Sequence, residues 1–284
     1  MLFPRSQRNT AFAIALLATL AVPKVSFSAN NSPVPAVLTE SWRFADIADL
    51  FGSAPIVLRA KIVTAIPIKG LALDPGTVRY LIEGDVVTLI RGAKAVSPRL
   101  RWLVDIKPDS RGKIPKLKKA DVLIAAIAVP GRPAEIQLAA GDAQVFWTAA
   151  FETRLRDVIE STAAPDAPPA ITGVVSAFHS AGTVPGEGET QIFLSTVTRA
   201  PVSLTILTRP NQPRRWALAL SEIVDEAAAP PATDTLAWYR LACFLPRTLP
   251  DAATAALAPA DADAARSDYA FVMNELVTCS RVRG

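Results

Sequence analysis

The sequence contains one histidine and two cysteines in 284 residues, which is too few for most metal-dependent chemistry. His179, Cys243 and Cys279 lie far apart along the chain and cannot alone supply the three or four ligands of a typical zinc site. No regular series of oxygen-bearing side chains suggests a calcium-binding loop. The G-x-S-x-G elbow and the P-loop motif are missing as well. From these absences we expect no metal site and no cofactor.

Long apolar runs are also scarce, and one of them lies near the start of the chain. Beyond that run, the longest purely apolar stretch is residues 122–129, which is too short to span a membrane as a helix. Residues 11–22 follow Arg5 and Arg8 and precede small residues, which is the order of a secretory signal peptide. We therefore expect Sec-type export, removal of residues 1–28, and a periplasmic or secreted protein. The alternative is an uncleaved N-terminal anchor.

The formal net charge of +4 overstates how basic the exported chain is. Three of its cations, Arg5, Arg8 and Lys24, belong to the predicted signal peptide, so the remaining chain carries +1. Non-specific binding to nucleic acid depends on many cations that neutralise phosphates. A nearly neutral chain therefore predicts no nucleic-acid partner.

Both cysteines lie near the end of the sequence, 36 residues apart. Thiols in an oxidising compartment usually pair, so we predict a structural disulfide between Cys243 and Cys279. In the chain-entropy model such a bridge stabilises the fold by about 3–4 kcal/mol. Two buried free thiols and a redox pair are the alternatives, and the spacing differs from the C-x-x-C pattern of redox pairs.

Alternating and continuous apolar patterns predict a β-rich α+β fold. In the first half we expect a short helix at 44–51, a helix at 148–161, and strands at 56–63, 78–90, 100–106, 121–129, 135–138 and 144–147. Gly84 interrupts the second strand and suggests a bulge or a hairpin turn. In the second half we expect strands at 171–178, 190–197, 202–207 and 216–224, and helices at 233–245, capped by Thr233 or Asp234, and 260–281.

A stretch rich in Ala, Pro and Asp, residues 163–170, predicts a linker between two domains. A flexible tether at 29–44 is expected before the first domain. The first domain, 45–162, is predicted to be a small OB-like barrel with a C-terminal helix. The second, 171–284, is predicted to be an antiparallel sheet packed against two C-terminal helices, which the disulfide links.

The order of strands in the first half resembles a known class of exported module. Residues 56–63, 80–92 and 118–129 follow the outline of the OB-type barrels in netrin modules and tissue inhibitors of metalloproteinases. The resemblance implies a small OB-type barrel. Those modules use cysteines that this half lacks, so protease inhibition does not carry over. The chain as a whole resembles uncharacterised exported bacterial proteins, which implies a compartment and no activity.

The single histidine offers one enzymatic hypothesis. His179 can be imagined as a general base, with Ser180 or Ser176 as nucleophile and Glu187 or Glu189 as the orienting carboxylate. Ser180 is adjacent to His179, however, so in a strand its side chain points to the opposite face. We therefore favour the interpretation of His179 as a polar residue at the end of a strand, and keep an unrecognised hydrolase as the alternative.

A strongly basic run at residues 99–119 is the most unusual feature of the chain. Against Asp105 and Asp109 it carries eight cations: Arg99, Arg101, Lys107, Arg111, Lys113, Lys116, Lys118 and Lys119. Alternation predicts that Arg101 projects outward while Trp102 takes the inner side. Residues 113–119 have no apolar period, which predicts a mobile loop.

Separated charge of this kind can steer a partner of opposite sign. Residues 222–268 carry eight acids against three cations, so the chain also has an acidic region. We interpret residues 99–119, with Trp102, as the binding face of an exported protein without catalytic activity. The partner would be an envelope protein, an acidic glycan or an anionic membrane surface. The alternatives are a solvated loop, self-association of the opposite charges, and assembly through unpaired strand edges.

Overall fold

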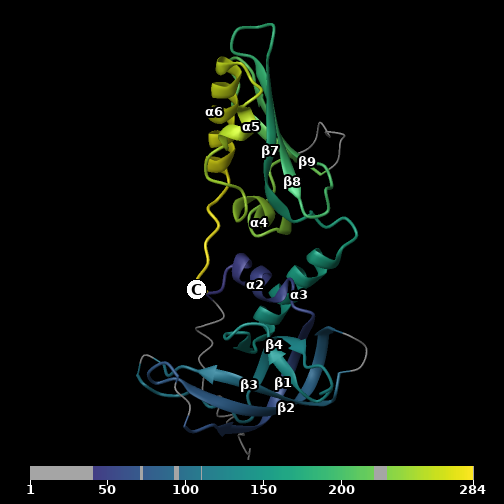
Figure 1. Cartoon of the computed structure of the whole chain (residues 1–284), viewed down its shortest axis with the longest axis vertical. Helices are drawn as coiled ribbons and strands as arrows, with labels where there is room; N and C mark the ends of the chain where they lie inside the picture. The colour runs from purple at the N-terminus through teal and green to yellow at the C-terminus, as the bar shows by residue number, and fades with distance from the viewer. Residues whose placement is uncertain (1–40, 71–72, 93–95, 110, 221–228, 284) are drawn as a thin grey trace, which may run out of the picture. The chain divides into compact units, whose positions relative to one another are not determined.

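The computed structural model describes residues 41–70, 73–92, 96–109, 111–220 and 229–283, which belong to one compact unit. The described chain forms two antiparallel sheets, one of six strands and one of four, together with five helices (Figure 1). The prediction of a β-rich α+β fold is therefore confirmed. Within these residues, no helix combines the length and the apolar character needed to cross a membrane. The predicted signal peptide and residues 29–40 of the tether lie outside the described residues.

Sheet A holds the first six strands in the order β3-β2-β1-β4-β5, and β6 also pairs with β4. Its strands are β1 (Ile56–Pro67), β2 (Val78–Arg91), β3 (Arg99–Ile106), β4 (Asp121–Ala128), β5 (Ile136–Leu138) and β6 (Gln144–Phe146). A single parallel bridge between Arg101 and Glu135 links β3 to β5. This bridge is one contact between the two sides of sheet A. That the sheet forms an OB-like barrel stays a prediction.

Gly84 lies inside β2 because a side chain there would collide with the core. A Cβ atom at Gly84 would lie 2.7 Å from the ring of Trp102, which packs across the strand. The β1–β2 register shifts between Ile62 and Thr64, directly opposite Gly84. The irregularity expected at Gly84 is thus a bulge in the partner strand, and β2 continues through it without a turn. This arrangement leaves Trp102 only 2% exposed.

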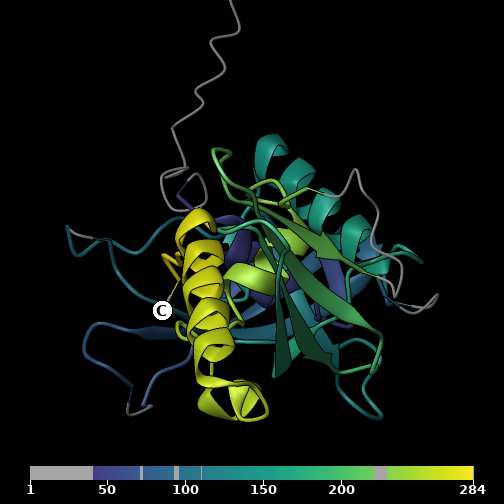
Figure 2. The ribbon, with the colours of Figure 1, turned by 90° about the horizontal axis from the view of Figure 1, so that it is seen from above.

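Sheet B holds the last four strands in the order β10-β9-β8-β7. They are β7 (Ile171–Ala181), β8 (Gly188–Thr196), β9 (Val202–Thr208) and β10 (Arg215–Ala219). Two helices, α5 (Asp251–Thr254) and α6 (Pro259–Glu275), contact β7, and α6 also contacts β8. Figure 2 shows α6 lying along one side of this sheet. Ile192, Leu204 and Ile206 are fully buried on the face that the helices cover.

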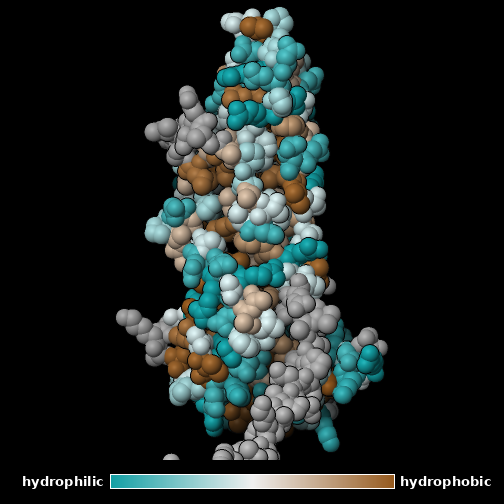
Figure 3. All heavy atoms as spheres, turned by 180° about the vertical axis from the view of Figure 1, so that it is seen from behind, coloured by the Kyte–Doolittle hydropathy of each residue, from teal (hydrophilic) through white to brown (hydrophobic). Residues whose placement is uncertain are grey.

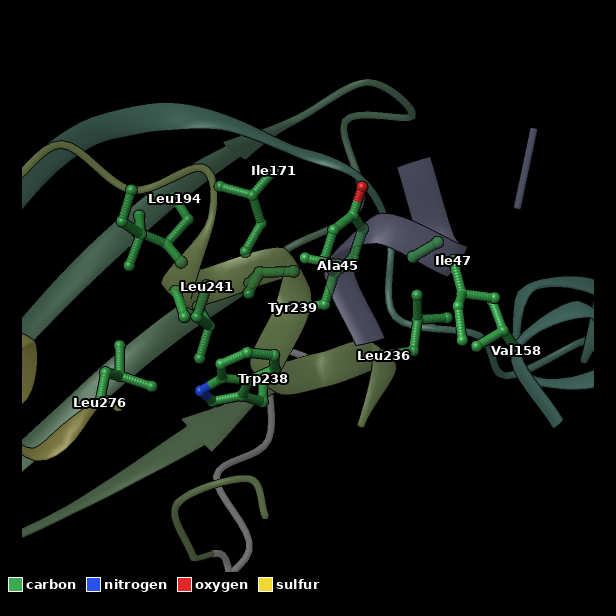
Figure 4. Packing of buried hydrophobic residues seen from close by; sticks show 14 of the residues in the cluster. Ala45, Ile47, Val158, Ile171, Leu194, Leu236, Trp238, Tyr239, Leu241 and Leu276 are labelled. Carbon is green, nitrogen blue, oxygen red and sulfur yellow. The ribbon is translucent and has the colours of Figure 1, made fainter. Parts of the chain in front are cut away.

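One large apolar cluster joins the helices of the first half to sheet B. It includes residues of α2 (Phe44–Phe51), α3 (Ala149–Ala163), sheet B and α4 (Leu236–Ala242). Figure 4 shows Ile47, Leu194 and Tyr239 among the side chains that gather there. A second cluster lies within sheet A and contains Trp102. Residues on both sides of the predicted linker therefore share a core, although the division into domains stays a prediction.

The predicted ends of the C-terminal helices are wrong. Helix α6 ends at Glu275 rather than near 281, and α4 begins after Thr235, whose hydroxyl accepts a hydrogen bond from the Trp238 amide. The short helix α5 was not predicted at all. The last residues leave the helical path because their amides are used elsewhere: those of Val282 and Arg283 donate to the Asp46 carboxylate. A helix through residue 281 would not bring these amides to Asp46.

The predicted disulfide between Cys243 and Cys279 is confirmed, with the two Cα atoms 5.1 Å apart. Cys243 caps α4, whereas Cys279 lies in the segment after α6, which we call the C-terminal tail (residues 277–283). Side chains of the tail also form ion pairs with the first half of the chain. Arg281 pairs with Asp49 of α2, and Arg283 pairs with Asp142. The disulfide thus fixes the start of the C-terminal tail, and the tail contacts both halves of the chain.

Candidate functional site

The basic run of the sequence divides into two structurally different parts. Its first part lies on β3, where the arginines have acidic neighbours. Arg99 forms two hydrogen bonds with Asp85, and Arg101 forms an ion pair of 3.4 Å with Glu135. The hydrogen bonds raise the pKa of Arg99 and lower the pKa of Asp85. The charge of β3 is therefore largely compensated within sheet A.

The second part is the connection between β3 and β4, residues 107–109 and 111–119, which we call the basic loop. Asp109 is its only carboxylate, and six exposed cations follow one another along it: Lys107, Arg111, Lys113, Lys116, Lys118 and Lys119. None of these six side chains forms an ion pair with any residue that the structure describes. Most of the uncompensated positive charge of the run therefore belongs to this loop.

Backbone hydrogen bonds give the basic loop a defined course. The Asp109 carboxylate accepts hydrogen bonds from the amides of Lys113 and Arg111, at 2.8 and 2.9 Å, and these bonds lower the pKa of Asp109. Gly112 between them has a φ of 74°, a conformation that glycine adopts without strain. The Asp109 carboxylate therefore organises the turn and also offsets part of the positive charge of the basic loop.

The second half of the loop is anchored to sheet A. Leu117 is 4% exposed and joins the apolar cluster of that sheet. The Lys119 amide then donates to the Ile62 carbonyl at 2.9 Å, with Lys119 in the left-handed region at a φ of 70°. We expected a mobile loop without a pattern, and the structure instead shows one buried apolar anchor between exposed lysines. Lys116 and Lys118, on either side of that anchor, are exposed to solvent.

Trp102 does not contribute to this surface. Its ring is buried, and its indole nitrogen donates to the Gln144 side chain at 2.7 Å. Arg101 projects outward, as the alternation of β3 predicts, with 53% of its side chain exposed. Of the predicted binding residues, Trp102 is thus part of the core and the cations lie at the surface.

A groove of about 730 Å³ runs along sheet A where β3 meets β5. Three arginines line it, and all of them have acidic partners: Arg79 pairs with Asp105, and Arg101 and Arg132 share Glu135. The groove offers a concave surface on sheet A, but each of its arginines already has an acidic partner. The groove was not predicted from the sequence, because Arg79 and Asp105 meet only through the β2–β3 register, and Arg101 and Glu135 meet only through the bridge between β3 and the residue before β5.

His179 lies on the face of β7 that α6 covers and belongs to a buried polar network. Its Nδ1 is 2.8 Å from the Thr190 hydroxyl, which donates a short hydrogen bond to Asp268. Because Thr190 has one hydroxyl proton and gives it to Asp268, it accepts from Nδ1–H of His179. Asp268 also pairs with Arg214 at 3.2 Å. Thr190 and Asp268 are almost completely inaccessible to solvent.

The residues that the hydrolase hypothesis required are not assembled around His179. Glu189 accepts a hydrogen bond from Gln191 on the opposite face of sheet B, where Ser180 also points. Glu187 lies against Gly182 at the tip of the β7–β8 hairpin. The actual partners, Thr190 and Asp268, are 78 residues apart and carry no motif that would reveal them. We interpret the network as structural, since the Thr190 hydroxyl is inaccessible to a substrate.

Metal ligands and the predicted acidic region add little to the site. Across the described ranges, no group of three or more His, Cys, Asp or Glu side chains is arranged to hold a metal ion. Glu222, Asp225 and Glu226 of the acidic region lie outside the described residues. Asp251 and Asp263 are highly exposed, and Arg266 pairs with both of them. No known protein family matches this chain, and neither does any curated protein sequence.

Proposed function

We propose that this chain is an exported, non-catalytic protein that binds a linear acidic polymer, such as an acidic glycan, through the basic loop. The observation that carries this proposal is the row of six exposed cations that have no ion partner among the described residues, in contrast to the paired arginines of β3. Like charges held this close repel one another until a ligand of opposite charge offsets them. We therefore expect the loop to bind a polyanion, whose repeated negative charges offset this repulsion.

The fixed course of the loop supports the same proposal. Asp109, Leu117 and the Lys119 amide hold the backbone at three points along it. A backbone that is already ordered loses less conformational entropy on binding than a mobile one. The cations are thus presented in sequence along the loop, an arrangement that suits an extended ligand with repeated negative charge.

The surroundings of the loop favour a polymer over a membrane or a protein. Among the exposed large apolar side chains in the described part of the chain, none lies between residues 107 and 119. Peripheral membrane binding normally combines basic residues with inserted apolar ones, and protein interfaces normally have an apolar centre. On the side drawn in Figure 3, hydrophobic side chains are scattered among hydrophilic ones. An acidic glycan needs neither an inserted anchor nor an apolar centre.

The disulfide supports the proposal that the protein works outside the cytoplasm. Structural disulfides form and persist mainly in oxidising compartments, and Cys243 and Cys279 are paired. Together with the signal-peptide pattern of residues 1–28, this favours a periplasmic or secreted location. Mass spectrometry of the exported protein is expected to show an N-terminus at or very near Ala29. An intact Met1 on the exported protein would argue for an anchor instead.

The binding proposal is tested with a triple variant, Lys116→Gln, Lys118→Gln and Lys119→Gln. Affinity for heparin or polygalacturonate is expected to fall about tenfold, since each exposed charge contact contributes a few tenths of a kcal/mol to binding. A matched control replaces three exposed cations elsewhere, Lys69, Arg209 and Arg215, with glutamine. Both variants change the net charge equally, so only the first is expected to lose affinity.

Three results would overturn the proposal. Equal losses in both variants would mean that net charge alone drives retention. Unchanged binding of the loop variant would make the loop a solvated connection. Binding to phosphatidylglycerol vesicles but not to either polysaccharide would assign the loop to a membrane surface.

A further inference from the structure

The face of sheet B that points away from α5 and α6 carries unusually exposed apolar side chains. Val175, Phe178 and Phe193 are 58%, 55% and 41% exposed. The register places Ser176 opposite Phe193 and Phe178 opposite Gln191, so these side chains share one face. Val175 is the extra residue of the bulge between Val174 and Ser176 and lies beside them. Large exposed aromatic and aliphatic groups near one another commonly mark a binding site.

A hollow of about 460 Å³ lies on this face, beside the hairpin between β8 and β9. Phe193 and Val175 provide its apolar surface, and Gln191, Ser195 and Ser203 provide amide and hydroxyl groups. The hairpin itself supplies Arg199 at the rim. The hollow thus combines an aromatic ring, several hydrogen-bonding side chains and one cation, which is the usual mixture in a site for a small polar ligand.

Arg199 is held in a conformation that favours glycine. Its φ is 60°, and its amide donates to the Thr196 carbonyl, while the Thr196 hydroxyl donates to the Ala200 carbonyl. Residues other than glycine adopt this region at some cost, which often persists where the side chain has a function. Within the described ranges, the Arg199 guanidinium forms no ion pair. A strained backbone therefore presents at the hollow a cation that no described carboxylate pairs with.

Next to the hollow, Thr205 has an unsatisfied hydroxyl. It lies across the ladder from Gln191, on the same face, and is 6% exposed. Its Oγ1 is buried, and no residue in the described ranges is its hydrogen-bond partner. A buried hydroxyl without a partner normally costs about 1–3 kcal/mol, so structures tend to keep one only where something else can satisfy it. Gln191, its neighbour across the ladder, donates to Glu189 at 2.9 Å, so a ligand in the hollow can pair with Thr205 once Gln191 moves aside.

From these features we infer that the hollow binds a sugar residue that bears a carboxylate. The ring of Phe193 can cover the C–H face of a pyranose, as aromatic side chains cover apolar surfaces. Gln191, Ser195 and Ser203 match its hydroxyl groups, and the Arg199 guanidinium matches the carboxylate with two parallel hydrogen bonds. The inference rests on sheet B alone and does not depend on the basic loop of sheet A.

Calorimetric titration of the oxidised full chain with tetragalacturonate tests the site, with the neutral methyl ester of the same oligosaccharide as the reference ligand. The acid is expected to bind about tenfold more tightly than the ester, because the charged hydrogen bonds to Arg199 are lost with the ester. Phe193→Ala is expected to weaken both ligands about tenfold. Arg199→Gly suits the left-handed backbone, so this variant should fold, and it should bind acid and ester equally.

Control variants separate the hollow from the rest of the surface. Phe178→Ala removes an exposed aromatic ring that lies on the same face but does not line the hollow, and Arg209→Gln removes an exposed cation beyond the far end of β9. Neither is expected to change binding. Equal affinity for acid and ester, equal losses in Phe193→Ala and Phe178→Ala, or loss of tetragalacturonate binding only in the basic-loop triple variant would each overturn the assignment. The last result would instead place the oligosaccharide on the basic loop.

Discussion

The basic loop and the C-terminal tail use charged residues in opposite ways. In the tail, Arg281 and Arg283 pair with Asp49 and Asp142, and the buried Asp46 carboxylate is surrounded by amides. In the loop, six cations remain exposed without ion pairs in the described part of the chain. Polar groups that satisfy one another stabilise a fold, whereas unpaired exposed charges contribute little to it. The charged residues of the tail therefore stabilise the fold, whereas those of the basic loop are available to bind a ligand.

The largest effect on stability is expected at Asp46, the fully buried carboxylate of α2. It accepts hydrogen bonds from the amides of Arg43, Val282 and Arg283. Asp46→Ala leaves these donors without their partner and is expected to lower the free energy of unfolding by about 3–5 kcal/mol. Urea unfolding followed by tryptophan fluorescence measures it. Asp46→Asn, which keeps one acceptor oxygen, is the control and should lose less.

A loss below about 1 kcal/mol in Asp46→Ala would contradict this interpretation of the tail. It would mean that water replaces the Asp46 carboxylate as the acceptor for the tail amides without penalty, and that the disulfide and the arginines alone hold the tail.

Removing the disulfide is expected to have the next largest effect. The double variant Cys243→Ala and Cys279→Ala loses a bridge across 36 residues, which should lower the free energy of unfolding by about 3 kcal/mol. The ion pairs of Arg281 and Arg283 should also weaken, because the tail is then free at its disulfide-bonded end. Hydrogen exchange at residues 277–283 is the decisive measurement. Unchanged protection there would show that the Asp46 contacts hold the tail without the bridge.

Local features of the fold could be predicted because their causes lie close together in the sequence. Phe44, Ile47, Ala48 and Phe51 recur at helical spacing, and α2 spans the expected residues. Alternation along β3 correctly placed Trp102 inside and Arg101 outside. The disulfide could be predicted from the number of cysteines and the expected compartment. In each case a short pattern or a simple count was sufficient.

Features that depend on distant partners could not be predicted. The end of α6 is set by amides that donate to Asp46, more than 230 residues away. The partners of His179 come from β8 and α6, and the anchoring of the basic loop depends on the apolar cluster of sheet A, in which Leu117 packs. The basic run was visible in the sequence, but its division into paired arginines and cations without a described ion partner depends on cross-strand neighbours such as Asp85.

The carboxylates that pair with the C-terminal tail should make the stability of the fold depend on pH, which the cations of the basic loop should not do at acidic pH. Burial alone would raise the pKa of Asp49, but hydrogen bonds from Arg281 and Tyr239 lower it overall. A hydrogen bond from Arg283 lowers the pKa of Asp142. Stability from a carboxyl with a lowered pKa is fully present above its unfolded value, about pH 4, and is lost as the pH falls through the folded value. The fold should therefore weaken progressively below about pH 4.

Asp49→Asn provides the test of that titration. The variant should be less stable than the wild type at neutral pH but should lose less stability on acidification, measured as urea unfolding at a series of pH values. Asp234→Asn, at an exposed carboxylate without an ion pair in the described part of the chain, is the control. If Asp49→Asn and the wild type lose stability in parallel below pH 4, Asp49 does not contribute to the acid sensitivity.

The smallest effect on stability is expected in the basic loop itself. Lys116→Gln, Lys118→Gln and Lys119→Gln break no ion pair that the structure describes and leave the Leu117 anchor in place. The free energy of unfolding should change by less than about 0.5 kcal/mol. Removing three of the six repelling charges should also make the variant less sensitive to salt, because less repulsion is left for salt to screen. Urea unfolding at low and high ionic strength measures both quantities. A marked loss of stability would show that the lysines are structural, like the arginines of the tail, and would remove the basis for assigning binding to the loop.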